Sequence, residues 1–120
     1  MKIEIYNKNE KSIAYINSNI VEIYNVQDAL DLMANCRYQG AESIIINEES
    51  ITPVFFDLKS GIAGEVLQKF SNYRMKIAII GDYSRYKSKS LQDFISESNK
   101  FGRINFSNSF EEAMKKLSRE

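Results

Sequence analysis

Three short apolar segments, separated by stretches with helical spacing, constrain the fold of this chain more than any other feature. They are residues 43–47 (SIIIN), 75–81 (MKIAIIG) and 103–106 (RINF). The first two are apolar on consecutive residues, which is typical of parallel strands covered on both faces. We therefore predict that these strands lie in one sheet, with the first two central and with right-handed helical crossovers between them.

Helices are predicted between and beyond these strands. The first begins after the N-cap candidate Asn25 and ends at Gly40, and the second covers residues 61–73. The third covers about residues 91–98 with Ser90 as its N-cap, and Ser109 is expected to cap the last.

The beginning of the chain alternates apolar and polar residues. Residues 2–6 and 12–16 therefore predict an antiparallel hairpin, whereas residues 17–24 are ambiguous and are left without regular structure. The expected fold is a single α/β domain over residues 1–120. Its single mixed β-sheet follows the order strand-strand-helix-strand-helix-strand-helix-strand-helix.

Composition excludes several classes of protein. With 16 Lys and Arg against 16 Asp and Glu, the chain of 120 residues lacks the basic field that nucleic-acid binding requires. No segment has the length and apolarity of a signal peptide or a membrane span, so we expect a cytoplasmic protein with neither nucleic acid nor membrane as partner.

Histidine is absent and Cys36 is the only cysteine. Catalysis by Ser-His-Asp or Cys-His groups, histidine metal ligation, disulfides and Cys-based zinc sites are therefore excluded. We expect Cys36 to be a small buried apolar side chain, and we predict no cofactor and no catalytic residue.

Acidic residues follow the predicted parallel strands, where ligands bind in open α/β sheets. Glu48, Glu49, Asp57 and Asp82 could converge there and hold a hard cation such as Mg²⁺. Solvated acids on loops are the favoured alternative, because no ligand spacing among these residues is diagnostic of a metal site.

Two loops carry hydroxyl groups just before helices. In the first, Asp57, Lys59, Ser60 and Gly61 begin the helix of residues 61–73, so a phosphate on Ser60 would meet free backbone N–H groups. A simple N-cap role for this serine is the favoured alternative.

The second loop, residues 82–90, combines Asp82, Tyr83, Ser84 and Arg85 with further lysine, tyrosine and serine residues. It could receive a phosphate, a nucleotide or an acidic partner. A polar loop that supplies a helix cap is the favoured alternative, since no Gly-rich phosphate loop accompanies it.

The chain resembles an uncharacterised bacterial family, domain of unknown function 4180, from about residue 20 onward. The resemblance is carried by residues 26–33 (VQDALDLM), by TP and FFDL within 52–58, by GE and LQKF within 64–70, and by residues 88–94. That family implies no activity.

A more distant resemblance is to the STAS domain, the fold of anti-sigma-factor antagonists such as SpoIIAA. Residues 56–63 (FDLKSGIA) are similar to its Asp-Ser-Ser-Gly loop, with one inserted residue and Lys59 in place of the first serine. Residues 76–81 and 109–113 are similar to its next strand and its last helix. This resemblance implies that Ser60 is the phosphorylated residue.

The leading hypothesis is therefore a cytoplasmic STAS-like regulatory domain that binds an unidentified protein partner. One alternative is a small-ligand or metal-dependent enzyme that uses the strand-end acids with Tyr83 and Arg85. Another is a carrier of apolar ligands, whose cavity would be lined by Phe55, Phe56 and Leu67. Homo-oligomer formation stays open.

Overall fold

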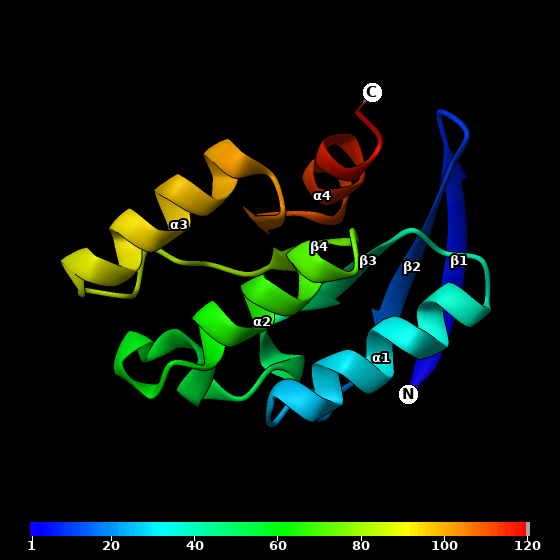
Figure 1. Ribbon diagram of the computed structural model, residues 1–120. Coiled ribbons are helices and arrows are strands. Elements are labelled where there is room, and N and C mark those ends of the chain that lie inside the picture. The colour runs from blue at the N-terminus through cyan, green and yellow to red at the C-terminus, as the bar shows by residue number, and fades with distance from the viewer. Residues whose placement is uncertain (120) are drawn as a thin grey trace.

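One five-stranded mixed sheet organises residues 1–119, the part of the chain that the computed structural model describes (Figure 1). In space the strands follow their order in the sequence, β1-β2-β3-β4-β5. The first pair is antiparallel and each later pair is parallel. Their bounds are β1 Lys2–Lys8, β2 Lys11–Asn17, β3 Ser43–Asn47, β4 Lys76–Ile80 and β5 Ile104–Ser107.

Four α-helices cover the sheet, three on one face and one on the other. They are α1 Val26–Tyr38, α2 Ile62–Asn72, α3 Lys89–Phe101 and α4 Phe110–Leu117. The predicted mixed α/β fold with a single sheet is thus confirmed.

Successive residues of the central strands point to opposite faces. In β3, Ile44 and Ile46 pack in the core shared with α1, α2 and α3, whereas Ile45 packs with Ala113 and Leu117 of α4. All three isoleucines are fully buried. Burial on both faces explains why this strand is apolar at consecutive positions, as the sequence predicted.

Local signals placed two of the helix starts correctly. The side chain of Asn25 accepts a hydrogen bond from the N–H of Asp28 at 2.9 Å, and Ser109 caps α4 through the N–H of Glu112 at 3.1 Å. The predicted cap of α3 was wrong. Ser88, rather than Ser90, accepts from a backbone N–H, so α3 begins at Lys89, two residues earlier than that cap implied.

The connection between β3 and α2 is more structured than the sequence suggested. It contains three short 3-10 helices, η1 (Glu48–Ser50), η2 (Pro53–Phe56) and η3 (Leu58–Ser60). Of residues 17–24, predicted without regular structure, Asn17 ends β2 and residues 18–24 form no named strand or helix, but Ile23 makes an isolated parallel bridge to Ile51. This bridge joins the segment between β2 and α1 to the connection between β3 and α2.

Two further observations complete the fold. Cys36 is a free cysteine and fully buried, as expected. None of the helices within residues 1–119 has both the length and the apolarity that crossing a membrane requires.

Candidate functional site

The most developed site lies at the carboxyl end of β3 and β4. There a pocket of about 540 Å³ opens beside η1 and the loop that follows β4. Its apolar wall includes Ile51, Pro53 and Phe56, and its polar wall includes Asn47, Glu48, Glu49 and Arg85. This is the edge of an open α/β sheet where ligands usually bind.

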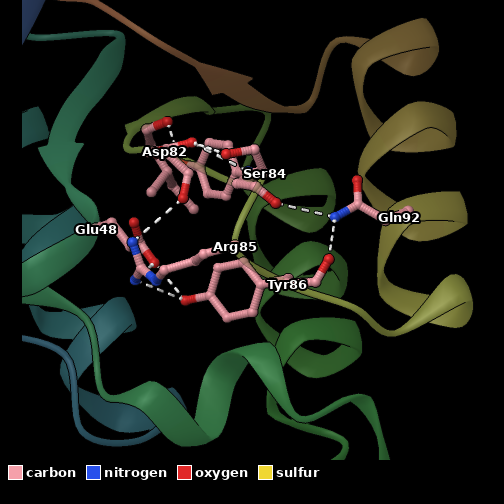
Figure 2. A network of polar contacts seen from close by, with 8 residues as sticks. Glu48, Asp82, Ser84, Arg85, Tyr86 and Gln92 are labelled. Atoms are coloured by element: carbon pink, nitrogen blue, oxygen red, sulfur yellow. Dashed lines mark hydrogen bonds and ion pairs between the residues drawn. The ribbon is translucent and has the colours of Figure 1, made fainter.

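Glu48 is the central residue of this site. Its side chain is only 10% exposed, and its Oε2 atom accepts hydrogen bonds from the guanidinium of Arg85 and the hydroxyl of Tyr86. Figure 2 shows these three side chains pointing toward one another. A buried carboxylate is stable only when charge and hydrogen bonds compensate its lost hydration, and both partners supply this compensation.

The partners of Glu48 are held in place from two directions. Gln92 of α3 donates to the carbonyl oxygens of Tyr83 and Tyr86, both at 3.0 Å (Figure 2). The ring of Tyr86 stacks on Phe56 of η2, with centroids 5.2 Å apart. The loop after β4 is therefore tied to both α3 and η2, and Arg85 and Tyr86 approach Glu48 from an ordered backbone.

The pKa values of both tyrosines in this loop, Tyr83 and Tyr86, are raised. Burial raises the pKa of Tyr83 far above its usual value, and the nearby charge of Glu48 adds to the effect. Its hydroxyl donates to the carbonyl oxygen of Ile79 at 2.6 Å. Burial, together with the bond to Glu48, also raises the pKa of Tyr86 to about 12. Both hydroxyls therefore stay protonated near neutral pH and act as donors.

The predicted ligand loop is divided by the structure. Arg85 lines the pocket, whereas Tyr83 is buried beneath the loop. Asp82 is exposed and accepts from the N–H and the hydroxyl of Ser84, which lowers the pKa of Asp82. Tyr86, which the sequence analysis included in this loop without singling it out as a site residue, donates its hydroxyl to Glu48. The only signal for it was its place between Arg85 and Lys87 in a loop rich in cations and aromatic rings.

The four strand-end acids do not form one cluster. Glu48 and Glu49 line the pocket, while Asp57 accepts a hydrogen bond from the N–H of Lys59 at the start of η3. Asp82 is engaged by Ser84. Within the described part of the chain, no three His, Cys, Asp or Glu side chains come together in a group that could hold a metal ion.

The loop around Ser60 forms a second, separate place of interest. The Ser60 hydroxyl donates to the carbonyl oxygen of Val54 at 2.9 Å and accepts from the N–H of Ile62 at 3.3 Å. Gly61 has a φ of 81°, a left-handed conformation that glycine adopts without strain. Ser60 and Lys59 are exposed. The serine thus connects η2 to the first turn of α2 at the surface.

The apolar residues considered for a carrier cavity do not share one cavity. Phe55 and Phe56 are buried in the main core, and Phe56 also lines the pocket at the sheet edge. Leu67 lines a different groove, between α2 and α3. Core packing is therefore the role that the structure gives the two phenylalanines.

Fold and site together define a mixed α/β domain with a pocket at the carboxyl edge of its parallel strands. The family model described as Domain of unknown function (DUF4180) matches residues 8–117, and the chain belongs to this family. No curated protein and no solved structure matches the chain. The family description names no activity, so the function must be argued from the residues themselves.

Proposed function

We propose that the protein is a STAS-like regulatory domain that binds a protein partner through residues 57–62 and the start of α2, with Ser60 as its switch. The observation that carries the proposal is the position of the Ser60 hydroxyl. It is exposed, yet it bridges the carbonyl oxygen of Val54 and the N–H of Ile62. A change at this one atom therefore acts on η2 and α2 together.

Phosphorylation would affect the two bonds differently. A phosphate ester has no proton on Oγ, so the bond to Val54 would be lost and η2 would be released from Ser60. The phosphate brings a charge of about −1.5 to −2. That charge would lie at the N-terminus of α2, where free N–H groups and the helix dipole favour anions. The helix would thus tolerate a modification that remodels the surface beside it.

The surface next to Ser60 has the composition of a contact patch. Val54 is 47% exposed, although it is apolar, and Pro53 and Lys59 are exposed beside it. An apolar centre with a nearby cation suits a partner with matching apolar and acidic groups. Two negative charges added there would repel such a partner, because misplaced charge at an interface costs several kcal/mol.

The alternative of a metal-dependent enzyme is less well supported. Asp57, Asp82 and Glu48 are each engaged by a different partner, respectively a backbone N–H, a serine and an arginine. This dispersal favours the interaction domain over a shared acidic centre.

Capture of partners from a lysate of the parent organism tests the proposal. Wild-type protein and the variants Ser60→Ala, Ser60→Asp and Ser96→Asp would serve as baits, with mass spectrometry as readout. Ser96 is an exposed serine of α3 and controls for added charge. A partner held by wild type and S96D but lost by S60D is expected, and S60A, which loses both bonds without gaining charge, separates the effect of the bridge from that of the charge. Equal capture by all four baits, or no specific protein on any bait, would overturn the proposal.

A further inference from the structure

We infer that the pocket beside Glu48 binds a small organic cation, whose ammonium or amidinium group donates a hydrogen bond to Oε1 of this carboxylate. The apolar body of the ligand would contact Pro53 and Phe56. This inference goes beyond the proposed function, since it uses neither residues 57–62 nor Ser60.

The two oxygens of the Glu48 carboxylate differ in their hydrogen bonds. Its Oε2 atom accepts from both Arg85 and Tyr86, while no donor from residues 1–119 reaches Oε1. The side chain is nine-tenths buried, yet within residues 1–119 Oε1 is not one of the fully buried atoms that lack a partner, so it stays accessible. An accessible carboxylate oxygen without a donor from the protein can accept a charge-assisted hydrogen bond from a ligand. A ligand donor would supply the missing partner.

Gly81 packs closely against the side chain of Glu48, and Oε1 is the atom nearest to the position of a Cβ at residue 81. A Cβ on this glycine would lie 2.8 Å from the Cβ of Glu48, closer than real Cβ contacts. The φ of Gly81 is not in the left-handed region, so close approach rather than backbone strain explains the glycine. Both residues line the pocket. The position of the carboxylate is therefore determined by packing.

The polar groups of the pocket favour a cation over an anion. Glu48 and Glu49 bring two negative charges against one positive charge from Arg85. The amide nitrogen of Asn47 is already engaged, since it donates to the hydroxyl of Tyr15 at 2.8 Å. The terminal nitrogens of Arg85 already donate to Glu48, Tyr86 and the carbonyl oxygen of Asp82. The free groups are thus mainly acceptors.

Size and apolar lining favour an organic ligand. The volume of about 540 Å³ lies within the range of roughly 300–1,000 Å³ that small-molecule sites occupy. Ile51, Pro53 and Phe56 give the pocket apolar surface that an inorganic cation would not use. An amine with an apolar body would satisfy both walls.

Arg85 makes the inference sharply testable, because it competes with the ligand for the same carboxylate. Its side chain is 58% exposed, so the protein does not depend on it for core packing. Without the positive charge of Arg85, the negative charge of Glu48 would be less compensated, so a cationic ligand would bind to it more strongly. The two partners of this ion pair should therefore have opposite effects on binding.

The experiment is a titration of the labelled protein with phenethylamine, followed by amide chemical shifts in NMR spectra. Phenylacetate and 2-phenylethanol, which share the phenyl group without the positive charge, are the matched probes. Saturable shifts of the amides of Gly81 and Ile51 with phenethylamine are expected, with at least about tenfold weaker binding of phenylacetate. Equal binding of all three probes, or no saturable shift, would overturn the inference.

Variants complete the test. Glu48→Gln should weaken phenethylamine binding at least about tenfold, and Arg85→Gln should strengthen it. Lys87→Gln is the matched control, since this exposed lysine of the same loop has the same charge. Tighter binding by K87Q equal to that by R85Q, or weaker binding by R85Q, would contradict the mechanism. If E48Q does not fold, R85Q and the probe series decide the question alone.

Discussion

Gly81 and Glu48 pack so closely that no side chain fits at position 81. A Cβ there would lie 2.8 Å from the Cβ of Glu48, and the glycine N–H donates to the carbonyl oxygen of Ser107 at 3.0 Å. Gly81, directly after β4, thus packs between Glu48 of η1 and Ser107 of β5, an arrangement that we call the clamp. Through this contact, the geometry of the sheet determines where the carboxylate of the pocket lies.

Replacement of this glycine tests the clamp. Gly81→Ala should destabilise the fold by about 1–3 kcal/mol, because Glu48 or the backbone must move to admit the methyl group. Urea unfolding measures the effect. Gly64→Ala is the control, since Gly64 lies exposed in α2 with nothing within 4 Å of its Cβ position. That variant should gain about 0.5–1 kcal/mol from helix propensity. Equal effects of the two variants would contradict the clamp.

Stability should fall at alkaline pH, partly through Cys36. Burial raises the pKa of this thiol from 9.0 to about 11. Between these values the folded state keeps a proton that the unfolded state has lost, so the contribution is complete below pH 9 and disappears as the pH rises through 11. Two pKa units correspond to about 2–3 kcal/mol.

Denaturant titrations at several pH values, for wild type and Cys36→Ala, measure this contribution. The loss of stability between pH 9 and 11 should be smaller for C36A. Tyr86 adds a further decline between its usual pKa of 10.0 and its folded value of about 12, and this part should persist in the variant. Parallel curves for both proteins would argue against a titrating buried thiol.

The start of α3 offers a comparison of two neighbouring serines. Ser88 accepts from the N–H of Leu91 at 3.2 Å, whereas Ser90 makes no cap bond. Ser88→Ala should cost about 1 kcal/mol, the usual value of an N-cap. Ser90→Ala should change stability by less than about 0.5 kcal/mol. Thermal unfolding of the two variants checks the difference, and a larger cost for S90A would reverse the assignment.

The buried hydroxyl of Tyr83 should contribute measurably to stability. Tyr83→Phe removes its donor to the carbonyl oxygen of Ile79, a bond of 2.6 Å. We expect a loss of about 1–2 kcal/mol in chemical denaturation, typical of a buried hydrogen bond. Tyr24→Phe is the control, because Tyr24 is 62% exposed. A loss in Y24F as large as in Y83F would show that the buried bond is not the cause.

The sequence predictions were accurate where a feature depends on residues that are near one another along the chain, and less accurate where distant parts of the chain decide it. Residues 43–47 were placed correctly because consecutive apolar residues need burial on both faces. Asn25 and Ser109 were recognised as caps because a cap acts on an N–H only three residues away. Ser90 was chosen wrongly because Ser88 offers the same local chemistry, and only the packing of α3 decides between them.

The candidate site shows the opposite situation. Glu48 and Arg85 were both noted in the sequence, one as an acid at a strand end and the other as a cation in a loop, and the enzyme alternative combined them in one pocket. Their direct ion pair was not predicted. Their pairing spans 37 residues, and the hydroxyl of Tyr86 joins from 38 residues away. No pattern along the chain encodes such a contact.

The amino-acid sequence by itself determined the strands, most helix boundaries and the mixed α/β class, because these depend on apolar periodicity and on hydrogen bonds between near neighbours. It also excluded histidine and disulfide chemistry. Only the tertiary structure decided which strand-end residues meet. The parallel pairing of β3 with β4 brings η1 beside the loop after β4, and the missing side chain of Gly81 lets Glu48 pack there. The pocket is therefore a product of strand pairing and close packing rather than of any motif.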